Sequence, residues 1–187
     1  MLKALKGMKA SALEFKGAYS LHTWSESART EVQSLCSIRE LINNAVEMED
    51  TQARNKDLDL KVHVKSAVPK VAILRVNSLT KVVQSCLSQA ISTSAPGSSL
   101  ELCCHSTTDL IYWEHTLRID IEWSKKTENS LENSSSSLLK RQNSSKMRIS
   151  DFEDQKYLSE SLGGSLSLKE SGGLCTANFL LKISIPP

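Results

Sequence analysis

Residues 162–181 read LGGSLSLKESGGLCTANFLL and hold four of the seven glycines of the chain. The pair Gly163-Gly164 is typical of a helix end, and Gly172-Gly173 directly after a serine is typical of a tight turn. Between and after these pairs, apolar residues alternate with polar ones, which is the period of a half-buried strand. The stretch therefore predicts a closing hairpin, with strands at 165–169 and 177–185.

Upstream of this hairpin the chain alternates between helical and strand patterns. Apolar side chains recur at helical spacing in four segments. These segments are 2–19, 31–53, 78–93 with Asn77 or Ser78 as N-cap, and 151–162. Alternation with period two predicts the strands. They are 58–64, 100–105, 110–115 and 117–123, with a polar turn at 106–109 and a short apolar run at 71–76.

This order of elements predicts an α+β fold. We expect a two-layer α/β sandwich, in which helices cover one face of a mixed, mostly antiparallel sheet. One domain is expected at 31–187, after a helical stub and connector at 1–30. Residues 124–150 are rich in serine and poor in apolar side chains, so they cannot offset their ordering entropy and are expected to form a disordered loop.

Composition excludes several classes of protein. The net charge is +2 and aromatic residues make up 5% of the chain, which argues against a nucleic-acid partner. No apolar run reaches the roughly 18–20 residues of a membrane-spanning helix, so no span is expected within this chain. The first residues lack the continuous apolar centre of a secretory signal.

The cysteines indicate the compartment. There are five, an odd number, and they are scattered without a CxxC pair. A reducing, intracellular compartment fits this pattern better than a disulfide framework or a zinc site, so we expect the cytoplasm. The basic, amphipathic start at 2–19 also suits the transit peptide of an organelle such as a plastid, although an ordinary first helix is the simpler interpretation.

Four stretches in this order resemble the ATP-binding catalytic domain of sensor histidine kinases, which belongs to the GHKL (Bergerat-fold) ATPases. Residues 37–48, SIRELINNAVEM, resemble its opening helix, and residues 58–76 resemble the following strand with its proline connector. Residues 78–91, SLTKVVQSCLSQAI, resemble the helix that carries the asparagine box, and residues 162–181 resemble the closing hairpin. Together the stretches span about 31–187.

The resemblance implies a site for Mg²⁺ and ATP on residues 78–91. The asparagine box supplies an amide oxygen to the metal, and in this chain the metal-binding position is Gln89. The upstream asparagine falls on Ser85, and the usual lysine falls on Ser92. Gln89 retains an amide oxygen one methylene further out, where the octahedral geometry of Mg²⁺ is harder to meet. The simpler interpretation is that these three residues form the polar side of an amphipathic helix.

The two glycine boxes of the family have no counterpart. The first, DxGxG, should follow the strand 117–123, where its Asp accepts the adenine amino group. Here the strand continues into Lys125 without a glycine, Trp123 adds bulk, and alternation predicts that Asp120 and Glu122 face solvent. The second should cradle phosphates before the last helix, yet 147–153 offers no glycine. Its neighbourhood holds carboxylates that would repel phosphate: Asp151, Glu153 and Asp154.

The sequence therefore predicts that the architecture is kept and the nucleotide chemistry is lost. We expect a pseudokinase-like signalling or scaffold module, without catalytic residues or a required cofactor. It would act on a protein partner, or as a homodimer through 2–19 and 31–53. An active histidine kinase or ATPase with a divergent pocket for ATP and Mg²⁺ is the first alternative. An unrelated α+β interaction domain is the second.

Overall fold

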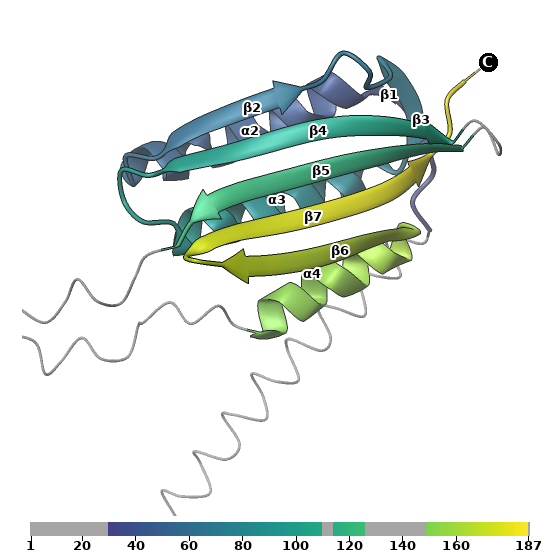
Figure 1. Ribbon diagram of the computed structural model, residues 1–187. Helices are drawn as coiled ribbons and strands as arrows, with labels where there is room; N and C mark the ends of the chain where they lie inside the picture. The colour runs from purple at the N-terminus through teal and green to yellow at the C-terminus, as the bar shows by residue number, and fades with distance from the viewer. Residues whose placement is uncertain (1–29, 110–113, 126–148, 187) are drawn as a thin grey trace, which may run out of the picture.

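The computed structural model describes residues 30–109, 114–125 and 149–186 (Figure 1). The elements in chain order are β1 (Ser34–Ser37), α2 (Ile38–Asn55), β2 (Asp59–Val64), β3 (Val71–Leu74), α3 (Val76–Thr93), β4 (Ser99–Asp109), β5 (Glu114–Ser124), α4 (Ile149–Ser161), β6 (Gly164–Ser171) and β7 (Leu174–Ile183). The predicted stub at 2–19 and most of the serine-rich loop at 124–150 lie outside the described residues.

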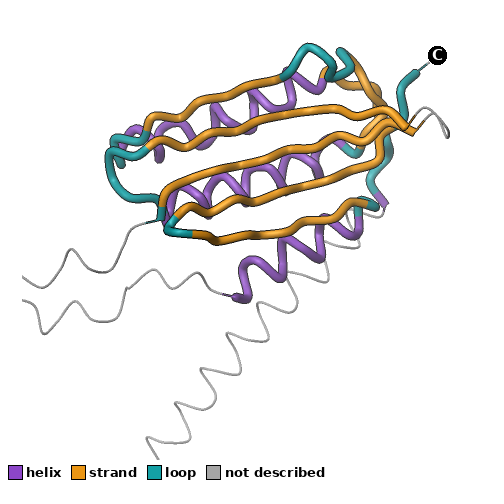
Figure 2. Tube along the Cα trace, in the orientation of Figure 1, coloured by secondary structure: helices purple, strands orange, loops and turns teal. Residues whose placement is uncertain are grey.

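The strands form one main sheet and one small ribbon. The main sheet has the order β2-β4-β5-β7-β6, and the ribbon pairs β1 with β3. Only β2 and β4 are parallel among the described pairs, and the other pairs are antiparallel. The helices gather on one side of the sheet, with α2 and α3 behind it and α4 beside β6 (Figure 2). This arrangement confirms the predicted α+β sandwich.

The core lies between the sheet and the helices. The inward positions of β5 are Leu117, Ile119, Ile121 and Trp123, and none is more than 2% exposed. On α3 the stripe that contains Val82 is equally buried, which matches its helical spacing in the sequence. Among the described helices, none is long and apolar enough to cross a membrane.

The predicted helix at 31–53 starts too early. Residues Ser34–Ser37 form β1 and pair with β3, and the helix begins at Ile38 with Ser37 as its N-cap. The Ser37 side chain accepts a hydrogen bond from the Glu40 amide at 3.3 Å. Val32 and Leu35 happen to share the helical spacing of the α2 stripe, but both are exposed, at 83% and 62%. Periodicity alone therefore could not locate this boundary.

Two further expectations are corrected. The predicted turn at 106–109 is wrong, because β4 runs unbroken to Asp109, which pairs with Glu114 of β5. Most of the strand predicted at 110–115 lies outside the described residues, and its last two residues belong to β5. Helix α3 begins at Val76 with Arg75 as its N-cap, whose side chain makes no capping bond, and neither Asn77 nor Ser78 holds that position.

The Gly163-Gly164 pair gives the first testable prediction. Gly163 has φ +79°, with open space around it, whereas a Cβ on Gly164 would lie 2.6 Å from the Leu180 carbonyl oxygen of the neighbouring strand β7. Gly164→Ala should therefore cost about 2–3 kcal/mol of unfolding free energy by forcing β6 and β7 apart. Gly163→Ala should cost only about 1–2 kcal/mol, from left-handed backbone strain.

Urea unfolding of the two glycine variants measures both effects. A Gly164→Ala protein as stable as the wild type would mean that β6 and β7 do not approach each other this closely.

Candidate functional site

The three asparagine-box positions lie along α3, which packs between α2 and α4. Ser85 and Gln89 are one turn apart and half-buried, as their spacing predicts. Next to Ser85 the neighbouring helix α4 inserts Gln155, which is 6% exposed. Its Nε2 donates to the Ser85 carbonyl oxygen at 3.3 Å, and its Oε1 accepts from Cys86 Sγ at 3.6 Å. A side chain of the protein itself therefore occupies this face of α3.

Hydrogen bonds from within the helix and from Lys56 occupy the carbonyl oxygens at the carboxyl end of α3. The Gln89 carbonyl oxygen accepts from Ser92 Oγ at 2.8 Å and from Thr93 Oγ1 at 2.9 Å. Lys56 Nζ donates to the carbonyl oxygens of Ile91 and Ser92, at 2.7 and 2.6 Å. Among the described residues, the Gln89 side-chain amide has no hydrogen-bond partner. Ser92 thus contributes a hydroxyl that is bound to its own helix, where the resemblance implies a lysine.

Trp123 stands at the end of β5, where the first glycine box should begin. Its side chain is 2% exposed and faces the helices. The indole Nε1 donates to Thr93 Oγ1 at 2.9 Å, so the ring joins the end of β5 to the end of α3. A base entering between these two ends would have to displace the largest fully buried side chain of the described residues.

The backbone after Trp123 is held in strand-like pairing. The Ala95 amide donates to the Ser124 carbonyl oxygen at 3.0 Å, and the Lys125 amide donates to the Gly173 carbonyl oxygen at 2.8 Å. A glycine box would instead need a turn free to approach a nucleotide. The described part of the second box, from Ile149 onward, is already the start of α4.

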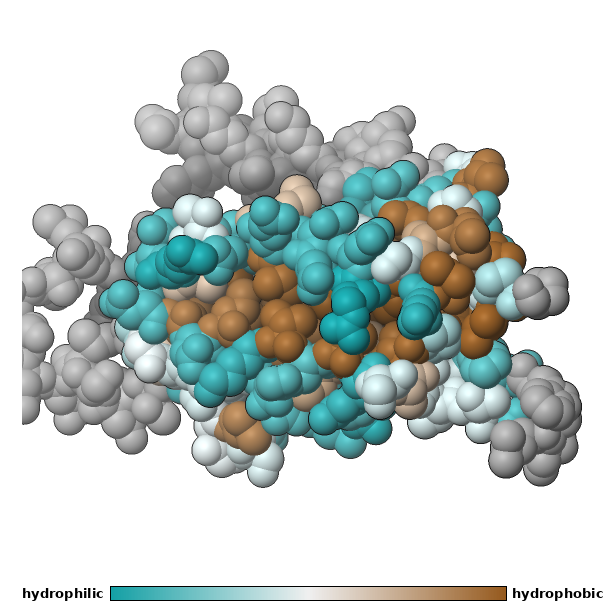
Figure 3. Space-filling view, turned by 90° about the horizontal axis from the view of Figure 1, so that it is seen from above, coloured by the Kyte–Doolittle hydropathy of each residue, from teal (hydrophilic) through white to brown (hydrophobic). Residues whose placement is uncertain are grey.

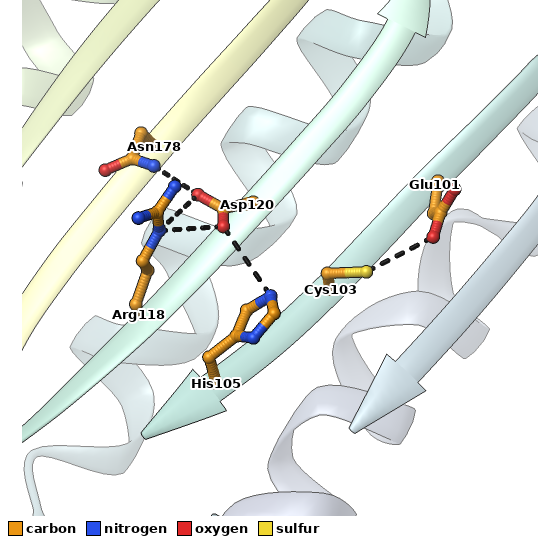
Figure 4. Close-up of polar contacts among 6 residues, drawn as sticks. All are labelled: Glu101, Cys103, His105, Arg118, Asp120 and Asn178. Atoms are coloured by element: carbon orange, nitrogen blue, oxygen red, sulfur yellow. Dashed lines mark hydrogen bonds and ion pairs between the residues drawn. The ribbon is translucent and has the colours of Figure 1, made fainter. Parts of the chain in front are cut away.

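Asp120 is buried, although the sequence predicted that it faces solvent. It points away from the helices, as alternation predicts, yet it is only 7% exposed. Figure 4 shows why: Arg118 Nε donates to both carboxylate oxygens, at 3.0 and 2.8 Å, and Asn178 Nδ2 donates to Oδ1. His105 Nε2 lies 3.7 Å from Oδ2. Asp120 therefore ties together three strands on the outer face and does not reach α3, while Glu122 is exposed as predicted.

This outer-face cluster brings a thiol, an imidazole and a carboxylate onto one side of the sheet. Sequence reasoning missed it, although the alternating positions 103, 105, 118 and 120 already placed these residues on one face. Cys103 Sγ donates to Glu101 Oε1 at 3.2 Å, and no bond joins it to His105 among the described contacts. Burial, and then the hydrogen bond to Glu101, raise the pKa of the Cys103 thiol to about 11.

Because Cys103 bonds to Glu101 and not to His105 among the described contacts, the thiol, imidazole and carboxylate do not form a hydrogen-bonded Cys-His-Asp triad. Among the described residues, no group of three His, Cys, Asp or Glu side chains could hold a metal ion.

The raised pKa predicts slow alkylation of Cys103. At pH 8 a thiol of pKa about 11 has about 100-fold less thiolate than one of the ordinary value of 9.0. Because a thiolate of higher pKa is also more nucleophilic, iodoacetamide labelling read by mass spectrometry should modify Cys103 at least about tenfold more slowly in the folded chain than in the urea-unfolded chain. Equal labelling rates in the folded and unfolded chain would contradict a raised pKa of the Cys103 thiol.

A cavity of about 510 Å³ lies near the other end of α3. Its lining includes Met48 of α2, Lys81 and Gln84 of α3, and Leu158 of α4, together with Glu31. None of the three asparagine-box positions lines it. The structure thus keeps an open space beside the amino-terminal half of α3 and closes the end of the helix where Gln89 and Ser92 stand.

Comparison with known proteins identifies the fold. No protein-family model and no curated protein sequence matches the chain. Among solved structures, a histidine kinase from Burkholderia phymatum is 15% identical with a TM-score of 0.66, covering 97% of this chain and 86% of that one. The Acinetobacter baumannii histidine kinase AdeS is 10% identical with a TM-score of 0.63, covering 98% and 82%.

A third structure, the catalytic domain of histidine kinase ThkA, is 12% identical with a TM-score of 0.59, covering 80% of this chain and 95% of that domain. The chain therefore has the fold of the catalytic, ATPase-type domain of histidine kinases. The resemblance seen in the four sequence stretches is confirmed at the level of the fold.

Proposed function

We propose that this chain is a non-catalytic module with the histidine kinase fold, which acts by protein–protein contact and does not use ATP. The proposal rests on the position of Trp123. Its buried ring fills the space between the ends of β5 and α3, and its indole N–H bonds to Thr93. Ser124 and Lys125 directly after it are held by backbone pairing, and the sequence from Ser124 to Leu162 contains no glycine that could approach a base.

The metal position gives further support. Gln89 stands where the resemblance implies an asparagine, and Ser85 and Ser92 offer hydroxyls in place of an amide and an ammonium group. Mg²⁺ needs several well-placed oxygen ligands at short distance. Helix α3 contains no acidic residue, and none of the contacts described above directs a carboxylate toward Gln89.

Apolar exposure supports the protein-contact part of the proposal. Leu35 and Val71 lie on the same face of the β1–β3 ribbon, because Leu35 pairs with Ile73 and Val71 with Ser37. Their exposed fractions are 62% and 38%. Figure 3 shows apolar side chains gathered at the end of the molecule where this ribbon lies. A protein partner or a second copy that contacts the N-terminal elements would cover them.

The five cysteines are all free, which supports a reducing compartment as part of the same proposal.

A phosphoryl-transfer assay tests the proposal. The chain is incubated with Mg²⁺ and ATP labelled on its γ-phosphate, and both ADP and label on the protein are measured. We expect neither above the background of heat-unfolded chain. ADP formation that falls in a Gln89→Ala variant would instead support the active kinase or ATPase alternative, because a contaminating enzyme would not respond to that substitution.

A further inference from the structure

The start of α3 is capped by a carboxylate from far upstream. The N-cap residue Arg75 makes no side-chain capping bond, and the first turn of α3 holds no acidic residue. Instead, the carboxylate of Glu31, 46 residues before Asn77, accepts two backbone hydrogen bonds. Its Oε1 accepts from the Asn77 N–H at 2.7 Å, and its Oε2 accepts from the Ser78 N–H at 2.9 Å. The Ser78 hydroxyl also donates to Glu31 Oε2.

These contacts satisfy groups that a helix cannot pair by itself. The first amides of an α-helix have no intrahelical acceptor, and a negative charge at this end also interacts favourably with the helix dipole. Hydrogen bonds to an ionised acceptor are stronger than neutral ones. Ser78 is 5% exposed, so without Glu31 its hydroxyl and amide would lose their described acceptor in a largely buried place.

Glu31 belongs to a short strap, residues 30–33, that leads into β1. Val32 is 83% exposed, so the strap buries little apolar surface of its own. Thr30 and Glu31 both line the cavity that also borders Lys81 and Gln84. The Glu31 bonds therefore hold the strap against α3 along the wall of this cavity.

We propose that Glu31 is a latch that couples the segment before β1 to α3. When bound, Glu31 caps α3 and keeps residues 30–33 over the cavity. When Glu31 is released, the first turn of α3 frays and the cavity opens toward the strap. Displacement of residues 30–33 by a partner is thereby coupled to the helix that carries Ser85 and Gln89, and the coupling acts equally in the reverse direction. The latch does not depend on whether ATP binds.

Hydrogen exchange of the full chain tests the latch directly. The amides of Asn77 and Ser78 should be protected in the wild type, although the first amides of a helix ordinarily exchange fast. In Glu31→Ala we expect these two amides to exchange at least tenfold faster, with β5 and β7 unchanged. Glu31→Gln, which retains one carbonyl acceptor, should give a smaller increase. Glu40→Gln is the matched control, since this exposed residue in the first turn of α2 should leave the Asn77 and Ser78 amides unchanged.

A second readout follows the strap itself. Trypsin cleavage after Arg29, with each rate divided by that of a 25–37 peptide of the same sequence to correct for the altered cleavage site, should be at least threefold faster in Glu31→Ala than in Glu40→Gln, because the released strap is easier for the protease to bind. Unchanged exchange at Asn77 and Ser78 in a folded Glu31→Ala protein would overturn the latch. So would a uniform increase over all elements, which would show that Glu31 acts only through global stability.

Discussion

Trp123→Ala should destabilise the domain by about 3–5 kcal/mol, the largest effect expected of any single substitution discussed for this chain. The indole ring is 2% exposed and packs at the end of the inward row of β5, next to α3. Its removal leaves a cavity in the core and removes the bond to Thr93 Oγ1. Guanidinium chloride unfolding followed by circular dichroism measures the loss.

Trp123→Phe is the matched control for this substitution. It retains an aromatic ring in the core and loses the indole N–H, while the Thr93 hydroxyl keeps its bond to the Gln89 carbonyl oxygen. We expect a loss of about 1–2 kcal/mol. If Trp123→Ala cost no more than Trp123→Phe, the ring would not fill the space between β5 and α3 and would not exclude a nucleotide from it.

Asp120→Ala should cost about 2–3 kcal/mol, although Asp120 lies on the face of the sheet that carries no helices. The substitution removes the carboxylate that accepts hydrogen bonds from both Arg118 and Asn178 and that lies beside His105. It therefore loosens the outer face across β4, β5 and β7. The estimate stays below that for a fully buried ion pair because half of the Arg118 side chain is exposed and can find water. Thermal and urea unfolding of the variant measure it.

Glu122→Ala is the control for Asp120→Ala. Glu122 lies two residues further along the same strand and on the same face, but it is exposed. We expect a change within about 0.5 kcal/mol. Equal effects of the two substitutions would show that the contacts of Asp120 add nothing to the stability of the sheet.

Sequence periodicity predicted most of the fold because each pattern reports one local geometry. The alternation in β2 and β7, the stripe of α3 and the two glycine pairs all correspond to elements of the structure. The errors fell where local pattern and tertiary pairing differ. Leu35 follows the helical spacing of α2, yet its backbone pairs with Ile73. The polar residues of 106–109 looked like a turn, yet they pair with β5 as part of β4.

The site was harder to predict, because its decisive contacts join residues far apart in the chain. The sequence indicated which glycines are missing and that Trp123 adds bulk, but not that its indole would bond to Thr93. Nor could it show that Gln155 would cover Ser85, or that Glu31 would cap α3. Alternation gave the correct face for Asp120 but not its burial, which depends on the side chains of two neighbouring strands.

Titration of the purified chain with ATP and Mg²⁺, read by calorimetry and by thermal shift, shows whether this domain binds nucleotide. We expect no saturable heat and no change in Tm up to millimolar ATP, for the wild type and for Gln89→Ala alike. Micromolar binding that Gln89→Ala abolishes would contradict this expectation, and would show that the asparagine-box position still holds a metal-bound nucleotide in spite of Trp123.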